Sequence, residues 1–496
     1  MVDHVDKKTK LLITGTAGLA FCGVLLETSL NVTFPEMTRY FKTGLGTVQW
    51  LTTGYLLVVA LTVLAAAWLE HSFTTRALIL TSVGIFLGSD LMCILAPCFP
   101  VLMAGRLLQG ISTGIALPLV FSLIMKKVPL HIQGRYVGSA GMAVALAPSL
   151  GPTFGGAVIQ ASSWRAIFLI VLPIELVFGL IALISVDRES AHVGPFAWLQ
   201  FLLLGIFLTG LTMGLSTLDV HGPITWLSLF IGALALVAGV WALAHQSTRL
   251  IDIAVFRNRT FTLALILYFL VQFVQIGLTF ILPNMAQSVL GETSTVAGLL
   301  LLPGSLLSAL CQPITGGYLD GHGLRGLLAV GSTAFFLSAL GFLVLSRHLT
   351  VPLMILLYAC YMVGQACVFN NLLTVGLQHI PAKLVPDGNA LFNTLQQYSG
   401  AASTGVLAAI ITGMPKASGI HAGAQAFQFG AVWAFVFVFL IVLGILLVAW
   451  FLERSLARQD KGEVQVVCPL IASERQWFQF RNEMPTQTAQ PIARTR

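Results

Sequence analysis

The chain has 496 residues, of which 57% are hydrophobic and only 9% are charged. Because an ordinary soluble domain carries about 25% charged residues, this composition excludes a soluble globular protein and predicts a polytopic membrane protein. The formal net charge of +7 does not indicate a nucleic-acid-binding protein, since no folded segment is dense in lysine and arginine. We expect the lipid bilayer, and no nucleic acid, around this chain.

Fourteen apolar runs of about 20 residues are long enough to cross a bilayer, and they predict an all-α polytopic membrane protein. The expected spans cover residues 11–34, 47–69, 77–95, 99–125, 136–160, 165–186, 194–217, 223–244, 260–285, 294–318, 326–346, 351–374, 388–412 and 429–452. The first run follows Lys7, Lys8 and Lys10, but it is too long for a signal peptide and lacks a small-residue cleavage site. We therefore expect it to be retained as the first span.

The seven cysteines show no pattern of a disulfide framework or a metal site. Their number is odd, five of them lie within apolar runs, and no C-x-x-C pair occurs. We expect neither disulfides nor a bound metal.

The basic residues predict which side of the membrane each loop faces. If the N-terminus is cytoplasmic, twenty of the 26 lysines and arginines fall in cytoplasmic segments and only five fall in segments on the outer side of the membrane. The remaining one, Arg106, lies within a span. An even number of spans places both termini on the same side. We therefore predict a multi-pass protein of the cell membrane with cytoplasmic N- and C-termini.

Two similar turns suggest an internal repeat. Residues 68–76 follow the second span and residues 318–325 follow the tenth, and each turn has an acid near its start and an arginine at its end. The predicted division is a cytoplasmic N-terminus, an N-terminal six-helix bundle, an inserted helix pair with its linker, a C-terminal six-helix bundle and a partly disordered cytoplasmic tail, at residues 1–10, 11–186, 187–259, 260–452 and 453–496.

Glu27 and Arg106 are charged residues inside apolar spans, where a charge costs roughly 2.5–3.5 kcal/mol on insertion scales. Each lies about seven residues from the outer end of its span, so both lie roughly 10 Å below the outer surface. If their helices face one cavity, the two side chains can pair. Burial favours a protonated carboxyl and a nearby arginine favours the charged form, so we predict that Glu27 titrates near physiological pH. The competing interpretation is a static ion pair that fixes helix packing.

Two more acids within spans are secondary candidates for proton coupling. Asp90 lies about five residues from the outer end of the third span, where interfacial water is within reach, and structural and functional roles are equally open. Glu175 follows Pro173 near the middle of the sixth span. It either faces the substrate as a further acid or hydrogen-bonds in its protonated form to a neighbour.

The fifth span carries small residues on one face. Ala147, Gly151 and Gly155 recur every four residues and allow another helix to approach closely, while Pro148 and Pro152 bend the helix. A hinge or seal is one interpretation of this pattern, and ordinary helix packing is the other.

These residues resemble the fourteen-helix drug/proton antiporter family of the major facilitator superfamily, over nearly the whole chain up to about Glu453. The residues that match the motifs of spans one, two and four are Leu26 to Pro35, Trp50, Tyr55, Arg106, Gln109 and Gly110. The matches to the antiporter signature of span five are Gly138, Gly151, Pro152, Gly155 and Gly156, with Ala147 in place of a glycine, and Ile251 to Arg259 resemble the joint motif.

The chain departs from the family pattern in two places. The family's usual acid in span one is Asp, whereas Glu27 is one methylene longer, which preserves titration but changes reach. The first copy of the cytoplasmic gating motif has decayed to Ala67 through Arg76, with Glu70 as its acid. The second copy is closer to the pattern, with Gly317, Asp320, Gly323 and Arg325.

The resemblance implies that spans one, four, nine and twelve line a central cavity. The polar and aromatic candidates for binding substrate are Trp50, Tyr55, Gln109, Gln272, Gln275, Gln365, Asn370 and Asn371. Neutral amides in an apolar wall suit a site that orients varied ligands, but hydrogen bonding between helices explains them equally well.

The function that the resemblance implies is secondary active transport and not enzyme catalysis. We expect a monomeric, proton-coupled antiporter that exports hydrophobic or cationic drugs across a bacterial cell membrane by alternating access, with no cofactor beyond the proton gradient. One alternative is an exporter of an endogenous lipid, a cell-envelope precursor or a metabolite. The other is a membrane-embedded sensor or enzyme, which the lack of a nucleotide loop, an H-E-x-x-H motif or a nucleophile elbow disfavours.

Overall fold

The computed structural model describes residues 5–30, 33–43, 45–187, 194–216, 222–245, 250–419 and 424–460. Within these ranges all regular structure is helical, which confirms the predicted class. The helices on the predicted spans are α1 (Lys7–Leu30), α3 (Leu45–Ser72), α4 (Thr75–Ile94), α5 (Phe99–Lys127), α6 (Gln133–Ala161), α7 (Trp164–Ser185), α8 (Trp198–Ser216), α9 (Pro223–His245), α10 (Arg259–Ser288), α12 (Leu302–His322), α13 (Arg325–Val344), α14 (Val351–Gln378), α15 (Val385–Ala417) and α16 (Ala424–Asp460).

Short helices connect some of these elements. They are α2 (Phe34–Phe41), η2 (Leu130–Ile132), η3 (Ile253–Arg257), α11 (Ser294–Leu299) and η4 (Ala382–Leu384). Local chemistry fixes several boundaries: the side chains of Thr74 and Asn258 accept hydrogen bonds from the first turns of α4 and α10. At the end of α12, Gly323 has a φ of 76°, a conformation that glycine adopts without strain.

The number of membrane spans is smaller than the predicted fourteen when it is judged by length and apolar composition. In the described part of the chain, 11 helices pass this test, or up to 12 if the two bent segments of α6 form one span. The apolar part of α8, Trp198–Gly214, is shorter than the rest. Helix α15 carries buried polar side chains, among them Asp387, Asn389 and Asn393, which lower its hydropathy.

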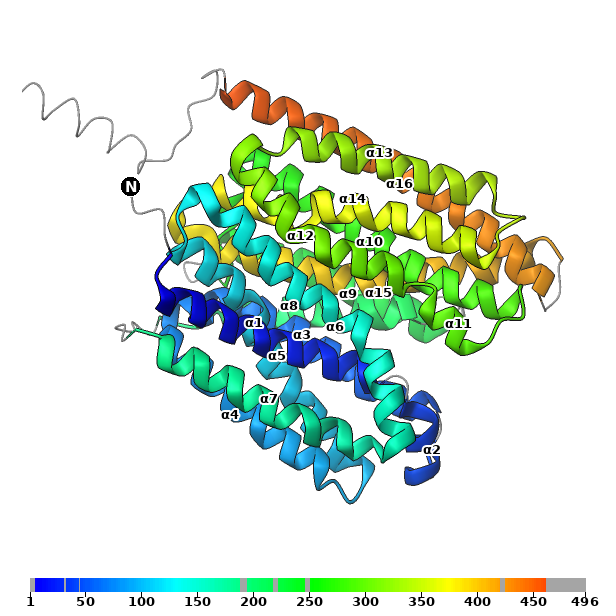
Figure 1. Ribbon diagram of the computed structural model, residues 1–496, viewed down its shortest axis with the longest axis horizontal. Helices are drawn as coiled ribbons and strands as arrows, with labels where there is room; N and C mark the ends of the chain where they lie inside the picture. Colours follow the sequence, from blue (N-terminus) through cyan, green and yellow to red (C-terminus); the bar gives the residue numbers. More distant parts are fainter. Residues whose placement is uncertain are drawn as a thin grey trace, which may run out of the picture. The chain divides into compact units, whose positions relative to one another are not determined.

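Helix α1 lies between α6 and α7 and also packs on α5 (Figure 1). Helices α3 and α4 pack on α5, whereas α10, α12 and α13 pack on α14. The two groups meet where α6 contacts α12 and where α15 contacts α3. Helices α8 and α9 pack on each other, and α8 also contacts α15.

Helix α6 is bent by 40° between its segments Leu130–Pro148 and Leu150–Ala161. The prolines at 148 and 152 remove backbone donors there, which explains the bend. A side chain at Gly151 would overlap Thr28 of α1, and one at Gly155 would overlap the backbone of Ser29. The small-residue face therefore packs on α1, while its role as a hinge stays a prediction.

Residues 1–453 form one compact unit, and residues 454–496 form a second. Of the second unit, the structure describes only residues 454–460, which are helical. The rest of the predicted tail, together with Asn31 and Val32 of the span-one motif, lies outside the described residues. The division into two six-helix bundles and an inserted pair stays a prediction.

Candidate functional site

Arg106 is the centre of a buried polar cluster, and none of its surface is exposed. Its Nη1 donates a hydrogen bond to Oε1 of Gln109 at 2.6 Å, and its Nε donates to the carbonyl oxygen of Leu51 at 3.4 Å. Its guanidinium carbon lies 4.2 Å from the centre of the Tyr55 ring. Since Gln109 is one helical turn further along α5, the regular helix itself brings the first two side chains together.

Gln109 connects the arginine to two buried carboxyl groups. Its Nε2 donates to Oδ1 of Asp90 on α4, and this bond together with the one from Arg106 fixes the orientation of the amide. The carboxyl group of Asp90 also interacts with that of Glu175 on α7. Neither Oδ2 of Asp90 nor either carboxyl oxygen of Glu175 has a hydrogen-bond donor within the described ranges. The cluster therefore links α5, α4 and α7 through side chains that the sequence predicted as separate site candidates.

Glu27 lies beside this cluster on α1 and keeps some exposed surface. Arg106 interacts with it electrostatically, but the two side chains do not form the expected ion pair, and no hydrogen bond reaches Glu27 from the described residues. The Nη1 and Nε donors of Arg106 bind Gln109 and the Leu51 carbonyl, and its Nη2 has no hydrogen-bond partner within the described residues. Glu27 is thus the one acid of the group that remains accessible.

Two residues that the sequence placed in the cavity occupy different surroundings. Tyr55 is fully buried, and its hydroxyl group donates to the carbonyl oxygen of Gly23 on α1 at 2.9 Å and lies 2.8 Å from Oγ1 of Thr113. It therefore supports Arg106 and joins α3 to α1 one turn before Glu27. Trp50, in contrast, is 41% exposed.

The amides of the second half divide into two groups. Three of them hydrogen-bond within the protein: Asn370, Asn371 and Gln275, whose partners are respectively Gln312 Oε1, the Cys367 carbonyl and Tyr358. Gln272 and Gln365 are buried, and the Oε1 atom of each has no donor in the described part of the chain. Bonds between helices thus explain Asn370 and Gln275, a bond within α14 explains Asn371, and neither explains Gln272 and Gln365.

A comparison of the sequence with known protein families identifies a family for this helical bundle. The family model of the Major Facilitator Superfamily matches residues 16–405. The chain belongs to the major facilitator superfamily. The facilitator is therefore a multi-pass membrane protein and a secondary transporter, not an enzyme.

Relatives of this facilitator include transporters from two bacteria. It is 30% identical over 454 residues to the uncharacterized MFS-type transporter YcnB of Bacillus subtilis, covering 90% of this chain and 94% of that protein. It is 34% identical over 408 residues to the lincomycin resistance protein LmrB of Listeria monocytogenes, covering 80% and 85%. The structure of the human organic anion transporter MFSD10 matches with a TM-score of 0.60 and 16% identity over 88% of this chain and 99% of that one, which supports the fold alone.

Two of the predicted gating residues, Asp320 and Glu70, bond to partners outside their own turns. Asp320 accepts hydrogen bonds from the backbone amides of Gly134 at 2.7 Å and Arg135 at 2.8 Å, so it caps the start of α6 in the other half of the chain. Glu70 forms an ion pair with Lys126 at 2.8 Å. Arg76, the arginine at the other end of the first turn, is exposed. The second copy of the motif thus holds the end of α12 against the start of α6, through the bonds from Asp320 to the α6 backbone.

Sequence reasoning missed a contact at the start of α15. Oδ2 of Asp387 lies 3.3 Å from Nε2 of His71 on α3, and its Oδ1 accepts from the amide of Asp252 at 3.0 Å. Two residues further along, Asn389 donates to the carbonyl oxygen of Pro118 at 2.6 Å. An acid in the first turn of an expected helix is a signal that could have identified Asp387, because negative charge stabilises a helix N-terminus.

The contact between α6 and α12 tolerates no side chain at Gly316. A Cβ atom there would overlap the carbonyl oxygen of Gly134, whereas one at the adjacent Gly317 would meet nothing within 4 Å. We expect Gly316→Ala to destabilise the purified facilitator by about 1–3 kcal/mol, because the backbone of α6 must move. Thermal unfolding in detergent measures this, with Gly317→Ala as the matched control. Equal melting temperatures for the two variants would contradict the close helix contact.

Charged and sulfur side chains do not assemble a metal centre in the part that the structure describes. The candidate site of the facilitator therefore consists of the accessible Glu27, the buried Arg106 cluster and the two unpartnered amides Gln272 and Gln365.

Proposed function

We propose that this facilitator is an antiporter that exports hydrophobic or cationic drugs across the cell membrane in exchange for protons, by alternating access of two helical bundles. The observation that carries the proposal is an accessible acid, Glu27, next to a buried arginine that is connected to two further acids. The relatedness to proteins named for lincomycin resistance supports a drug-like substrate. Assignment to the fourteen-helix antiporters is supported by the helix found on each predicted span.

In this proposal Glu27 is the proton carrier. It keeps accessible surface, so a proton can reach it, and no hydrogen bond within the described residues must break when it is protonated. Arg106 interacts electrostatically with Glu27 while its own hydrogen bonds hold it in place. Protonation of Glu27 then changes the net charge of the cavity by one unit, which allows it to compete with a bound cation.

The pair formed by Asp90 and Glu175 is proposed to hold a further proton. Both residues are fully buried on apolar helices, and their carboxyl groups interact with each other. Two negative charges at such close range in an apolar interior are strongly disfavoured, and a shared proton supplies the missing hydrogen bond. Gln109 connects this pair to Arg106, so the protonation of the pair and the charge at the centre of the site are coupled.

The substrate is proposed to contact the second half of the chain at Gln272 and Gln365. Their amide carbonyl groups are buried acceptors without a protein donor in the described ranges, and a buried acceptor of this kind gains about 1–3 kcal/mol from a bound donor. Because amides are uncharged, they accept donors from ligands of different shape and charge. This suits varied amphipathic compounds.

Transport by the purified full-length protein in proteoliposomes tests the function. Under an imposed pH gradient we expect movement of a hydrophobic cationic dye against its own gradient, and collapse of the pH gradient by an ionophore should stop it. Glu175→Gln supplies a permanent donor to Asp90, so we expect a folded protein that moves fewer protons per dye. Dye movement at the same rate with and without the pH gradient would refute antiport. An unchanged proton-to-dye ratio in Glu175→Gln would show that the carboxyl pair has only a structural role.

A further inference from the structure

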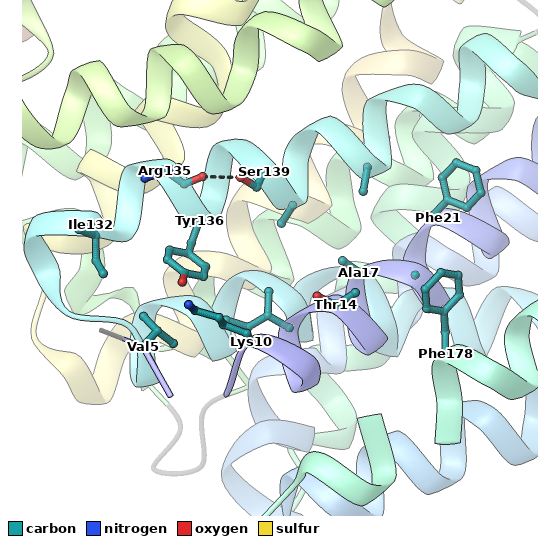
Figure 2. Close-up of a pocket in the computed structure, with 14 residues that line it drawn as sticks. Val5, Lys10, Thr14, Ala17, Phe21, Ile132, Arg135, Tyr136, Ser139 and Phe178 are labelled. Atoms are coloured by element: carbon teal, nitrogen blue, oxygen red, sulfur yellow. Dashed lines mark hydrogen bonds between the residues drawn. The ribbon is translucent and has the colours of Figure 1, made fainter. Parts of the chain in front are cut away.

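A cavity of about 730 Å³ lies between α1, α6 and α7, apart from the cluster around Arg106 (Figure 2). Side chains of both polar and apolar kinds line it. The polar ones are Lys10, Thr14, Arg135, Tyr136 and Ser139, and among the apolar ones are Ala17, Phe21, Ala143 and Phe178. This cavity belongs to none of the sites described above.

The two ends of the cavity differ in chemistry. Lys10, Arg135 and Tyr136 gather near the starts of α1 and α6, whereas Phe21 and Phe178 lie at the other end (Figure 2). Lys10 and Phe21 are eleven positions apart on one helix, which corresponds to about 16 Å. Because the hydrocarbon core of a bilayer is roughly 30 Å thick, the cavity extends over about the depth of one leaflet.

Lys10 and Arg135 form no ion pair with an acid within the described residues, although Arg135 lies close enough to Asp320 to interact with it electrostatically. Lys8 and Lys127 both bind Asp187, and together they hold the pKa of that carboxyl below its usual range. Lys10, in contrast, has no acidic partner within the described residues, and the carboxylate of Asp320 bonds to the Arg135 backbone amide and not to its guanidinium group. Two exposed cations therefore remain at the polar end.

The apolar end adjoins surface that faces the bilayer. Phe178 lines the cavity, and its neighbour Val177 on α7 is 55% exposed, as expected for a residue in contact with lipid tails. Small residues on α1, such as Ala17, and on α6, such as Ala143, leave the space between the helices unfilled. A hydrocarbon chain in the bilayer can therefore enter from the side.

We propose that this cavity binds one anionic phospholipid, with the phosphate between Lys10 and Arg135 and an acyl chain between Phe21 and Phe178. The hydroxyl groups of Tyr136 and Ser139 add hydrogen-bond donors for the headgroup. The same two cations repel a cationic drug, so the occupant differs from the proposed substrate. The basic residues predict that this end of α1 is cytoplasmic, where the leaflet carries anionic lipids.

Native mass spectrometry of the full-length protein in detergent tests the site. The protein is titrated separately with phosphatidylglycerol and phosphatidylcholine of identical acyl chains, and we expect one phosphatidylglycerol molecule to bind more tightly than any phosphatidylcholine. Removal of both charges in the double variant Lys10→Ala, Arg135→Ala should weaken that binding about 30-fold, since each basic residue contributes to anionic-lipid affinity. The double variant Lys7→Ala, Arg76→Ala removes the same charge from exposed positions outside the lining and should bind as the wild type does.

Two further experiments distinguish a bound phospholipid from a simple bound anion. Ala143→Phe fills the apolar end and leaves both charges, so it should also lose the tightly bound phosphatidylglycerol. Inorganic phosphate at millimolar concentration should not displace the lipid, because it has no acyl chain. Equal affinity for both lipids in the wild-type protein, or displacement by phosphate alone, would overturn the proposal, and this wild-type comparison does not depend on any variant folding.

Discussion

Glu27→Gln is expected to abolish efflux driven by the pH gradient, down to the background of empty vesicles, while equilibrium dye binding matches that of the wild type with Glu27 protonated. Glutamine has nearly the shape of glutamate but cannot bind and release a proton. Since no hydrogen bond or ion pair reaches Glu27 from the described residues, the substitution strands no buried partner. We therefore expect stability to change by less than about 0.5 kcal/mol.

Glu27→Asp is the matched control, because it keeps a titratable carboxyl with one methylene less. It should retain part of the gradient-driven efflux in the same proteoliposomes. We expect the partial loss to come from the shorter side chain, because the carboxyl group still binds and releases a proton. Dye efflux by Glu27→Gln at the wild-type rate under the imposed gradient would exclude Glu27 as the proton carrier. Dye binding that still weakens on acidification in Glu27→Gln would exclude Glu27 as the group at which proton and cation compete.

Arg106→Met should be the most destabilising single change in the site. The arginine is fully buried, and its removal leaves Oε1 of Gln109 without its donor and withdraws a positive charge that interacts with Asp90. Loss of a buried, hydrogen-bonded charge costs about 3 kcal/mol. We expect a clearly lower midpoint of thermal unfolding in detergent and no gradient-driven efflux.

Arg106→Lys separates charge from geometry. A lysine keeps the positive charge, but a single ammonium group cannot reproduce the planar fork that contacts Gln109 and the Leu51 carbonyl while lying over Tyr55. It should recover about half of the lost stability. Arg76→Met removes an exposed arginine and should not shift unfolding. If Arg106→Met and Arg76→Met unfold at the same temperature, the buried cluster contributes nothing to stability.

The sequence predicted the helices well because hydropathy reports directly which segments are apolar. Charges inside spans identified Glu27, Arg106, Asp90 and Glu175, and the structure brings three of these four into one hydrogen-bonded or interacting cluster. The direct ion pair was wrong because hydropathy does not determine the rotation of each helix about its axis. The arginine bonds to Gln109, one turn further along its own helix, and not to Glu27.

Other parts of the site could not be derived from spacing. Gln109 matched a motif, but its role in connecting two charged groups depends on α4 and α5 being adjacent. The membrane-span pattern of α15 is weak because its polar side chains bond to other helices, as Asn389 does to Pro118. Such long-range partners are tertiary properties, and no local pattern encodes them.

The contact of Asp320 with α6 has a consequence for how this protein can vary. Its two donors are backbone amides, and every residue except proline supplies one, so the side chain at position 135 can change without loss of the contact. Arg135 is therefore constrained by the cavity that it lines and not by the closure of the helices. Natural variation at this position should follow the lipid composition of the host membrane, while Asp320 and Gly134 should remain fixed.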